Sequence, residues 1–147
     1  MKLSDILSAD SVLLAPKAKS KRQLLQDISE FAAQKAHIDS RTVFDTLLER
    51  ENLGSTGFGN GVALPHGRLT ELDKAYAFFV KLATPIDYDA IDNKPVDILF
   101  LLLSPESSGA DHLTALAQIS RLLKDKNLVT KLREAESQEE ILALLHN

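Results

Sequence analysis

The sequence predicts an α/β fold in which helices cover a mixed sheet. Two observations support this prediction: apolar residues recur at helical spacing near both ends of the chain, and the middle third changes to short apolar runs typical of strands. Amphipathic helices must bury their apolar stripes, so helices outside and strands inside indicate layers packed on a sheet. No repeat, low-complexity tract or interdomain linker divides the 147 residues, and we expect one domain, 1–147.

Two helices are expected in the first third of the chain. Residues 20–36 place Leu, Ile, Phe and Ala side chains on one helical face, and Ser20 with Gln23 matches a capping box. The second helix should begin near Asp39 or the residue after it. It should end before Gly54, which is suited to the left-handed conformation that terminates a helix.

The strands are expected in the middle of the chain, with one short addition near the start. The run 96–104 is almost continuously apolar, as expected of a central strand covered on both faces. Residues 84–95 are rich in Asp and bounded by prolines, so they should form turn and loop. The other strand candidates are 11–15, 61–65 and 75–83.

The last third returns to helical periodicity. Residues 112–125 carry a Leu and Ile stripe, a second helix follows over 127–135, and a third is expected over 137–145. Ser137 and Glu140 form another capping-box pattern at the start of the last helix.

Composition and charge exclude several classes of partner. The net charge of −4 argues against nucleic acid and against a polybasic membrane surface site, because both need a basic face. There is no cysteine, hence no disulfide, thiolate nucleophile or Cys-ligated metal. The N-terminus lacks the long apolar stretch of a signal peptide, and no run approaches the ~20 residues of a membrane span. We expect a cytoplasmic protein that does not insert into membranes.

One glycine-rich stretch, GSTGFGNGVALPHGR, stands out in the sequence. It holds five of the six glycines, and such a loop can let backbone amides converge on an anion. No Gly-Lys-Ser/Thr follows, as a Walker A loop requires, and a strand follows where a dinucleotide fingerprint needs a helix. ATP and NAD are therefore poorly supported, and we expect no cofactor. The five glycines are Gly54, Gly57, Gly59, Gly61 and Gly67.

His66 is the leading candidate for chemistry in this stretch. Pro65 restrains Leu64 to extended geometry, which should hold His66 at the end of a strand on a fixed backbone, and Gly67 leaves its far side uncrowded. An imidazole presented in this way can act as a nucleophile, a general base or a ligand. The alternative is a turn histidine that only bonds a carbonyl.

His112 is the second candidate, because it follows the long apolar strand where ligands commonly bind in α/β proteins. The alternative is that Asp111 caps the helix and His112 lies on its exposed first turn. His37 and His146 are interpreted as surface residues.

Arg50 lies near the end of the second expected helix, where a cation complements the helix dipole. It can also face the glycine-rich stretch and bind a phosphoryl oxygen. Glu49 and Glu51 flank it and are equally compatible with solvent exposure.

The motif ERENLGSTGFGNGVALPHG resembles the active-site signature of the fructose/mannitol class of enzyme IIA in the bacterial phosphotransferase system. The resemblance runs along nearly the whole chain. LGSTGFGNGVALPHGRL, PIDYDAIDNKPVDILFLLL and HLTALAQIS are most similar to the nitrogen-regulatory branch of that class. One departure is Phe58, where we expect a smaller aliphatic residue. The resemblance implies one α/β sandwich with a mixed sheet of about five strands.

The resemblance also implies the roles of the site residues. His66 would be the phosphoacceptor, with Nε2 as its nucleophilic atom, and Arg50 and His112 would lie beside it. Amides of the phosphate loop would help to stabilise the transferred charge; its residues are Ser55, Thr56, Gly57, Gly59 and Gly61. The donor would be a histidine phosphocarrier protein, which is charged in turn by a phosphoenolpyruvate-dependent enzyme I. No metal or nucleotide is implied.

Three hypotheses about function follow. The first is a phosphoryl-accepting regulator of the nitrogen branch, which acts on ion-transport or nitrogen-linked partner proteins through its phosphorylation state. The second is a sugar-specific enzyme IIA that passes phosphate to an enzyme IIB. The third is a metal-dependent hydrolase using His66, His112 and Asp111, although no ligand pair at i, i+4 or HxH spacing supports it.

Overall fold

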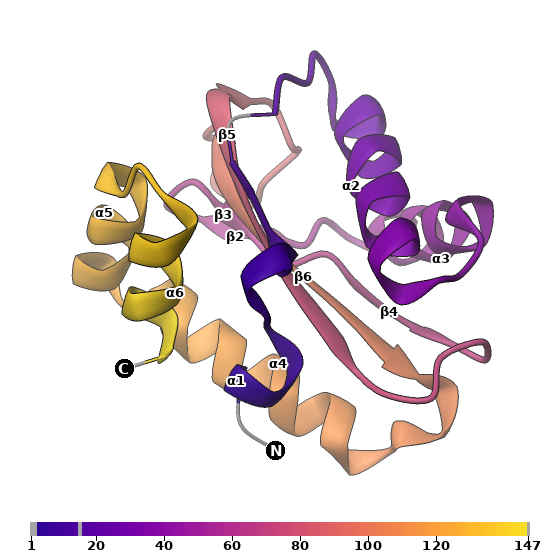
Figure 1. The fold of residues 1–147 in the computed structure, drawn as a ribbon. Helices are drawn as coiled ribbons and strands as arrows, with labels where there is room; N and C mark the ends of the chain where they lie inside the picture. Colours follow the sequence, from indigo (N-terminus) through magenta and orange to yellow (C-terminus); the bar gives the residue numbers. More distant parts are fainter. Residues whose placement is uncertain (1–2, 15, 147) are drawn as a thin grey trace.

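A mixed sheet forms the centre of the fold, and helices cover both of its faces (Figure 1). The computed structural model describes residues 3–14 and 16–146. The helices are α1 (Leu3–Ile6), α2 (Lys21–Ala36), α3 (Ser40–Asn52), α4 (Ala110–Lys124), α5 (Lys126–Glu134) and α6 (Gln138–His146), with short 3-10 turns η1 (Ala9–Ser11) and η2 (Glu106–Ser108). The strands are β1 (Val12–Leu14), β2 (Gly57–Gly59), β3 (Val62–Ala63), β4 (His66–Leu69), β5 (Tyr76–Ile86) and β6 (Val96–Pro105).

The sheet is built around the antiparallel pair β5 and β6. Strand β1 runs parallel to β5, and both β3 and β4 run parallel to β6. Val62 pairs with Ile98 and His66 pairs with Leu102. Four residues separate the two positions on each side, so β3 and β4 pair with β6 in the same register. The expected mixed sheet of about five strands is confirmed, with β3 and β4 forming one interrupted line.

Two apolar cores lie on the two faces of this sheet. Alternate residues of β6 enter different cores, because successive side chains of a strand point to opposite faces. Leu99, Leu101 and Leu103 pack towards α2 and α3, whereas Ile98, Phe100 and Leu102 pack towards α4, α5 and α6. Figure 1 shows these two helical layers on opposite sides of the sheet. Burial on both faces explains why the β6 sequence is almost continuously apolar.

The prediction of a single strand over 61–65 is wrong in its bounds and in the number of strands. Strand β3 covers only Val62–Ala63, and the glycine-rich residues before it form a second strand, β2, which pairs with β3 in an antiparallel hairpin. Asn60 and Gly61 make the turn with φ angles of 58° and 79°. Two successive residues at positive φ give a tight turn whose twist matches that of the flanking strands.

Other boundaries differ by a few residues. Strand β5 continues to Ile86, so the expected loop over 84–95 begins later, and α4 begins at Ala110 instead of residue 112. The short α1, η1 and η2 were not predicted, because three or four residues carry too little periodicity. Within the described residues, no helix is long and apolar enough to span a bilayer.

The helix caps follow the sequence in part. The Ser20 hydroxyl oxygen accepts a hydrogen bond from the Gln23 amide at 3.1 Å, as expected, but the Gln23 side chain accepts from the Lys19 amide instead of closing the box on Ser20. Asp39 caps α3. Leu53, in a right-handed helical conformation, follows that helix, and Gly54 has a φ of 150° and not the expected left-handed helical value.

Gly67 allows α3 to pack directly against β4. A Cβ atom at this position would lie 2.6 Å from Cγ2 of Thr46 on α3, closer than any real contact. We predict that Gly67→Ala destabilises the fold by about 1–3 kcal/mol, because overpacking forces the helix away from the strand. Urea unfolding of the variant measures this loss.

The control for this prediction is the double variant Gly67→Ala with Thr46→Ala, which removes the clashing methyl group. It should recover part of the lost stability. Equal unfolding free energies for wild type and Gly67→Ala would contradict the close packing of α3 on β4.

Candidate functional site

The candidate site lies at the edge of the sheet, where β4 has no further strand beside it among the described residues. Side chains from both helical layers meet β4 there and enclose an open pocket of about 380 Å³. Helix α3 supplies one wall and the start of α4 supplies another. The lining residues are Thr46, Glu49, Arg50, Leu53, His66, Gly67, Arg68 and His112.

His66 is the first residue of β4, and not the last residue of the strand before it as expected. Pro65 has no amide hydrogen to give to a sheet, which separates β3 from β4. Gly67 and Leu69 face α3 and its core, so alternation places the side chains of His66 and Arg68 on the α4 side. The half-buried imidazole therefore lies on a paired strand whose backbone is fixed by β6.

A hydrogen bond sets the tautomer of His66. Its Nδ1 atom lies 2.8 Å from the carbonyl oxygen of Leu64. A carbonyl can only accept, so Nδ1 carries the hydrogen and donates it. In the neutral ring Nε2 then holds the free electron pair. The geometry thus leaves Nε2 as the atom able to attack an electrophile.

The surroundings of His66 favour this neutral ring. Burial lowers the pKa of its imidazole below 6.5, and the nearby positive charge of Arg50 acts in the same direction. The Leu64 hydrogen bond and the negative charge of Glu51 oppose the shift. The balance keeps an unprotonated Nε2 available at neutral pH.

His112 lies beside His66, with ring centroids 5.9 Å apart and planes inclined by 48°. The alternative of an exposed histidine on the first helical turn is wrong, because His112 is only 4% exposed. Asp111 does not cap α4 either, since Gly109 occupies the N-cap position. Nδ1 of His112 lies 2.8 Å from the hydroxyl oxygen of Ser104, a buried residue of β6.

The buried His112 remains neutral over a wide pH range. Desolvation lowers its pKa to about 4, and the positive charge of Arg68 and the neighbouring His66 contribute in the same direction. A hydroxyl can donate or accept, and in the tautomer whose Nδ1 accepts from Ser104 the ring carries Nε2–H as a donor. This donor suits the stabilisation of negative charge beside His66.

Arg50 reaches the same pocket from α3, on the other side of the sheet. Its Nη1 donates to the carbonyl oxygen of Gly54 at 2.8 Å, which holds the guanidinium at the end of the helix. The rest of the guanidinium has donors for an anion in the pocket. The dipole interpretation and the binding interpretation of Arg50 are therefore compatible.

Glu51 differs from the solvent-exposed residue that its flanking position allowed. It is only 7% exposed, and Lys21 forms an ion pair with its Oε1 at 3.0 Å. The amide of Thr56 donates to the same oxygen at 3.0 Å, the Thr56 hydroxyl donates to Oε2, and the Tyr88 hydroxyl donates to Oε2 at 3.2 Å. This buried cluster fastens the loop after α3 to α2 and to the Tyr88 segment. Glu49 is exposed and lines the pocket.

The residues of the expected phosphate loop do not line the pocket that contains the two histidines. The Ser55 hydroxyl donates to the carbonyl of Tyr88, and Thr56 belongs to the Glu51 cluster. Gly57 packs against Ala90 and Tyr88, which requires a residue without a side chain. Gly59 lies near Asp92 and Gly61 near Arg133, on the β2–β3 hairpin. Phe58 packs against the core on the α4 side.

Arg68 is the site residue that sequence reasoning missed. It lines the pocket, and its Nη2 lies 3.5 Å from the carbonyl oxygen of Gly109 at the start of α4. The signal was its spacing: two residues after His66 on one strand places both side chains on the same face.

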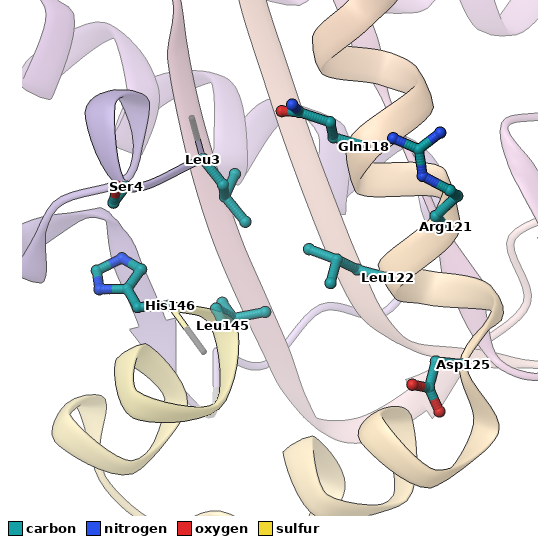
Figure 2. A pocket seen from close by; sticks show the side chains of 8 residues that line it. All are labelled: Leu3, Ser4, Gln118, Arg121, Leu122, Asp125, Leu145 and His146. Atoms are coloured by element: carbon teal, nitrogen blue, oxygen red, sulfur yellow. The ribbon is translucent and has the colours of Figure 1, made fainter. Parts of the chain in front are cut away.

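A second hollow, of about 410 Å³, lies at the other end of α4 and shares no residue with the histidine pocket. Figure 2 shows its lining side chains, which come from α1, α4, α6 and the residue between α4 and α5, and which include Arg121 and His146. His37 and His146 are exposed, as expected. In the part of the chain that the structure describes, no three His, Asp or Glu side chains group as metal ligands, so the hydrolase hypothesis has no ligand set.

Comparison with known proteins identifies relatives of this arrangement. A family model described as phosphoenolpyruvate-dependent sugar phosphotransferase system, EIIA 2, matches residues 5–147. A nitrogen regulatory protein of Bradyrhizobium diazoefficiens is 45% identical over 145 residues, covering 99% of this chain and 95% of the relative. A fructose-specific EIIA component of Haloferax volcanii is 33% identical, covering 97% and 94%. The crystal structure of nitrogen regulatory protein IIA-Ntr from Neisseria meningitidis superposes with a TM-score of 0.91 at 34% identity, covering 96% and 97%.

The low pKa of His112 predicts a loss of stability in acid. Between pH 6.5 and about 4 the unfolded chain binds a proton at this residue and the folded chain does not, so the free energy of unfolding falls as the pH falls through that window. His112→Gln keeps a hydrogen-bonding group but does not titrate. Its unfolding free energy should therefore depend less on pH across the window than that of wild type, as measured by urea unfolding at several pH values.

An NMR titration of the wild-type imidazoles provides the direct check. The His112 resonance should titrate well below pH 6.5, at about 4. Titration of His112 near 6.5, with the same pH dependence of stability in both proteins, would contradict a buried neutral ring.

Proposed function

The chain belongs to the EIIA 2 family of the phosphoenolpyruvate-dependent sugar phosphotransferase system, and we propose that it is a regulatory member that accepts a phosphoryl group on His66. The observation that carries this proposal is the Leu64 hydrogen bond, which leaves Nε2 of His66 unprotonated on a fixed backbone. The similarity to nitrogen regulatory proteins along almost the whole chain supports the regulatory role.

The transfer step follows from the tautomer. The electron pair of Nε2 forms a new N–P bond, the N–P bond of the donor phosphohistidine breaks, and its electron pair returns to the donor ring. Nδ1 of His66 keeps its hydrogen, so the phosphorylated ring carries positive charge and its hydrogen bond to Leu64 becomes charge-assisted. The transfer needs in-line positioning and little covalent work by the protein.

Arg50 and His112 are the groups that offset the negative charge of the phosphoryl oxygens. They come from different layers and meet at the pocket of His66. Arg50 supplies a permanent charge, and neutral His112 supplies a hydrogen bond from Nε2. Both side chains already line the pocket of His66, so this chain's own residues stabilise the negative charge of the phosphoryl oxygens.

The donor in this proposal is a histidine phosphocarrier protein that docks over the sheet edge. Two large apolar side chains beside the site are exposed: Leu53 by 83% and Leu113 by 63%. Leu53 lines the pocket, and Leu113 is the chain neighbour of His112. An apolar rim around a polar centre suits transient protein docking, because it excludes water from the transfer.

Regulation would operate through the charge that phosphorylation adds. A phosphoryl group brings up to about two negative charges to the pocket. A partner that covers the site with an apolar or acidic surface must then desolvate that charge or is repelled. A differential binding free energy of about 1.4 kcal/mol changes the affinity tenfold, enough to switch a contact with an ion-transport or nitrogen-linked regulator.

The second candidate function is that of a sugar-specific enzyme IIA that passes phosphate to an enzyme IIB. Its support is the 33% identity to a fructose-specific EIIA component, which also extends along almost the whole chain. Both candidates use the same phosphoacceptor, so the fate of the phosphoryl group separates them.

The first prediction from this function concerns the phosphoacceptor. Incubation with phosphoenolpyruvate, enzyme I and a phosphocarrier should add one phosphoryl group to wild type and none to His66→Ala, because no other nucleophile occupies its position. Intact-mass measurement detects the addition, and the adduct should be lost in mild acid and survive alkali. His146→Ala, at an exposed histidine remote from the pocket, is the matched control and should be phosphorylated like wild type. A full equivalent on His66→Ala would refute the assignment.

The second prediction concerns the output. His66→Ala and fully phosphorylated wild type, used as baits in cell extract, should retain different partner sets or bind shared partners with different affinities. The physical reason is the added charge at the docking surface. Identical partners and affinities, together with efficient transfer from the phosphorylated chain to a sugar enzyme IIB, would favour the transport role instead.

A further inference from the structure

Arg68 has no role in the transfer described so far, although its side chain lies on the same face of β4 as His66. The two residues are two positions apart, so their Cα atoms lie about 7 Å apart along the strand. Both line the pocket, together with His112. An arginine side chain at this spacing can reach a phosphoryl group that projects from Nε2 of its neighbour.

The guanidinium of Arg68 is held only weakly by the rest of the protein. Its contact with the Gly109 carbonyl is long, at 3.5 Å, and among the described residues no carboxylate lies within ion-pair distance of it. Arg133 provides the contrast, because it pairs with Asp97 at 2.9 Å and also donates to Asn60. Arg68 is exposed, and most of its five donor hydrogens remain for another acceptor.

The pocket is positive although the chain as a whole carries a net charge of −4. Arg50 approaches the two histidines from α3 and Arg68 from β4, and Glu49 is the acidic side chain among the described lining residues. The positive charge of Arg68 reaches far enough to lower the pKa of His112. A site with two arginines against one glutamate attracts a group with two negative charges more strongly than one with a single arginine.

Resting on the proposed function, we propose that Arg68 binds the phosphoryl group on His66 and thereby holds it on this chain. The contact forms only once the phosphoryl group is bound at Nε2, so it stabilises the phosphorylated product relative to the free protein. The equilibrium between the phosphorylated carrier and this chain then shifts towards this chain. A retained phosphoryl group suits a regulator, because its phosphorylation state has to persist until a partner protein binds.

The two arginines have different roles in this arrangement. Arg50 is fixed by a 2.8 Å bond to Gly54 at the end of α3, whereas the more weakly held Arg68 is free to turn towards the phosphoryl group once it is on Nε2. A planar guanidinium can give two parallel hydrogen bonds to phosphoryl oxygens, which an ammonium cannot. The proposal therefore predicts a different result for a lysine than for a neutral side chain at this position.

The experiment measures the equilibrium of phosphoryl exchange. A stoichiometric amount of phosphorylated phosphocarrier is mixed with the unphosphorylated chain, and intact mass gives the fraction of each protein that is phosphorylated after the exchange has stopped changing. Arg68→Gln should shift the equilibrium constant towards the carrier by about tenfold, the effect of losing a hydrogen bond to a charged group. Arg68→Lys should lie between Arg68→Gln and wild type.

The matched control is Arg121→Gln, which makes the same change of charge and residue at the other end of α4 (Figure 2). It should leave the equilibrium constant unchanged. Loss of stability alone would not move the ratio between two folded phosphorylated proteins, and unfolding midpoints of all variants verify that they are folded.

The outcomes separate this proposal from the proposed function. If wild type takes up no phosphoryl group, the proposed function fails. If wild type is phosphorylated and Arg68→Gln reaches the same equilibrium, or reaches it only more slowly, Arg68 does not hold the phosphoryl group and the inference is wrong.

Discussion

The parallel register between residues 62–69 and β6 is the constraint on which the site depends. It fixes the backbone on both sides of Pro65, whose carbonyl accepts the amide of Leu102 at 3.1 Å. Successive carbonyls of an extended chain point in opposite directions, so the carbonyl of Leu64 points away from β6. The Leu64 carbonyl, free of β6, accepts the hydrogen bond from Nδ1–H of His66. The pairing that builds the sheet thus also determines which imidazole nitrogen is free to react.

The buried Glu51 cluster extends this constraint to the other side of the sheet edge. A carboxylate removed from water is tolerated only when charge and hydrogen bonds compensate it, and Lys21, Thr56 and Tyr88 do so. Together they tie the end of α3 to α2 and to the chain before β2. Arg50 is the residue before Glu51, so the same cluster fixes the backbone from which its guanidinium reaches the pocket. The buried charge of Glu51 thus stabilises the position of the functional charge on Arg50.

Much of the fold was predictable because periodicity is a property of consecutive residues. The helical stripes and the apolar β6 run located the layers, and the Pro65 and Gly67 neighbours drew attention to His66. The hairpin of β2 and β3 was not predictable in this way, since its glycines were interpreted as an anion loop and their positive φ angles serve a turn and close packing instead. Burial of Glu51 and the role of Ser104 depend on residues distant in sequence, and a single sequence carries no record of such contacts.

The edge position of β4 reconciles two opposing demands on the site. Burial lowers the pKa of the His66 imidazole and so increases its unprotonated fraction, yet a protein donor has to reach its outward nitrogen. An interior strand would bury His66 beyond reach, and a loop would leave its ring free to rotate and to protonate. On the edge strand the Leu64 bond and the two helical layers enclose the ring from the inner side, while the open side faces Leu53 and the pocket. The half-buried state of His66 is therefore a consequence of strand order, because the neighbouring strand β2 begins opposite Ala63 and runs away from β4.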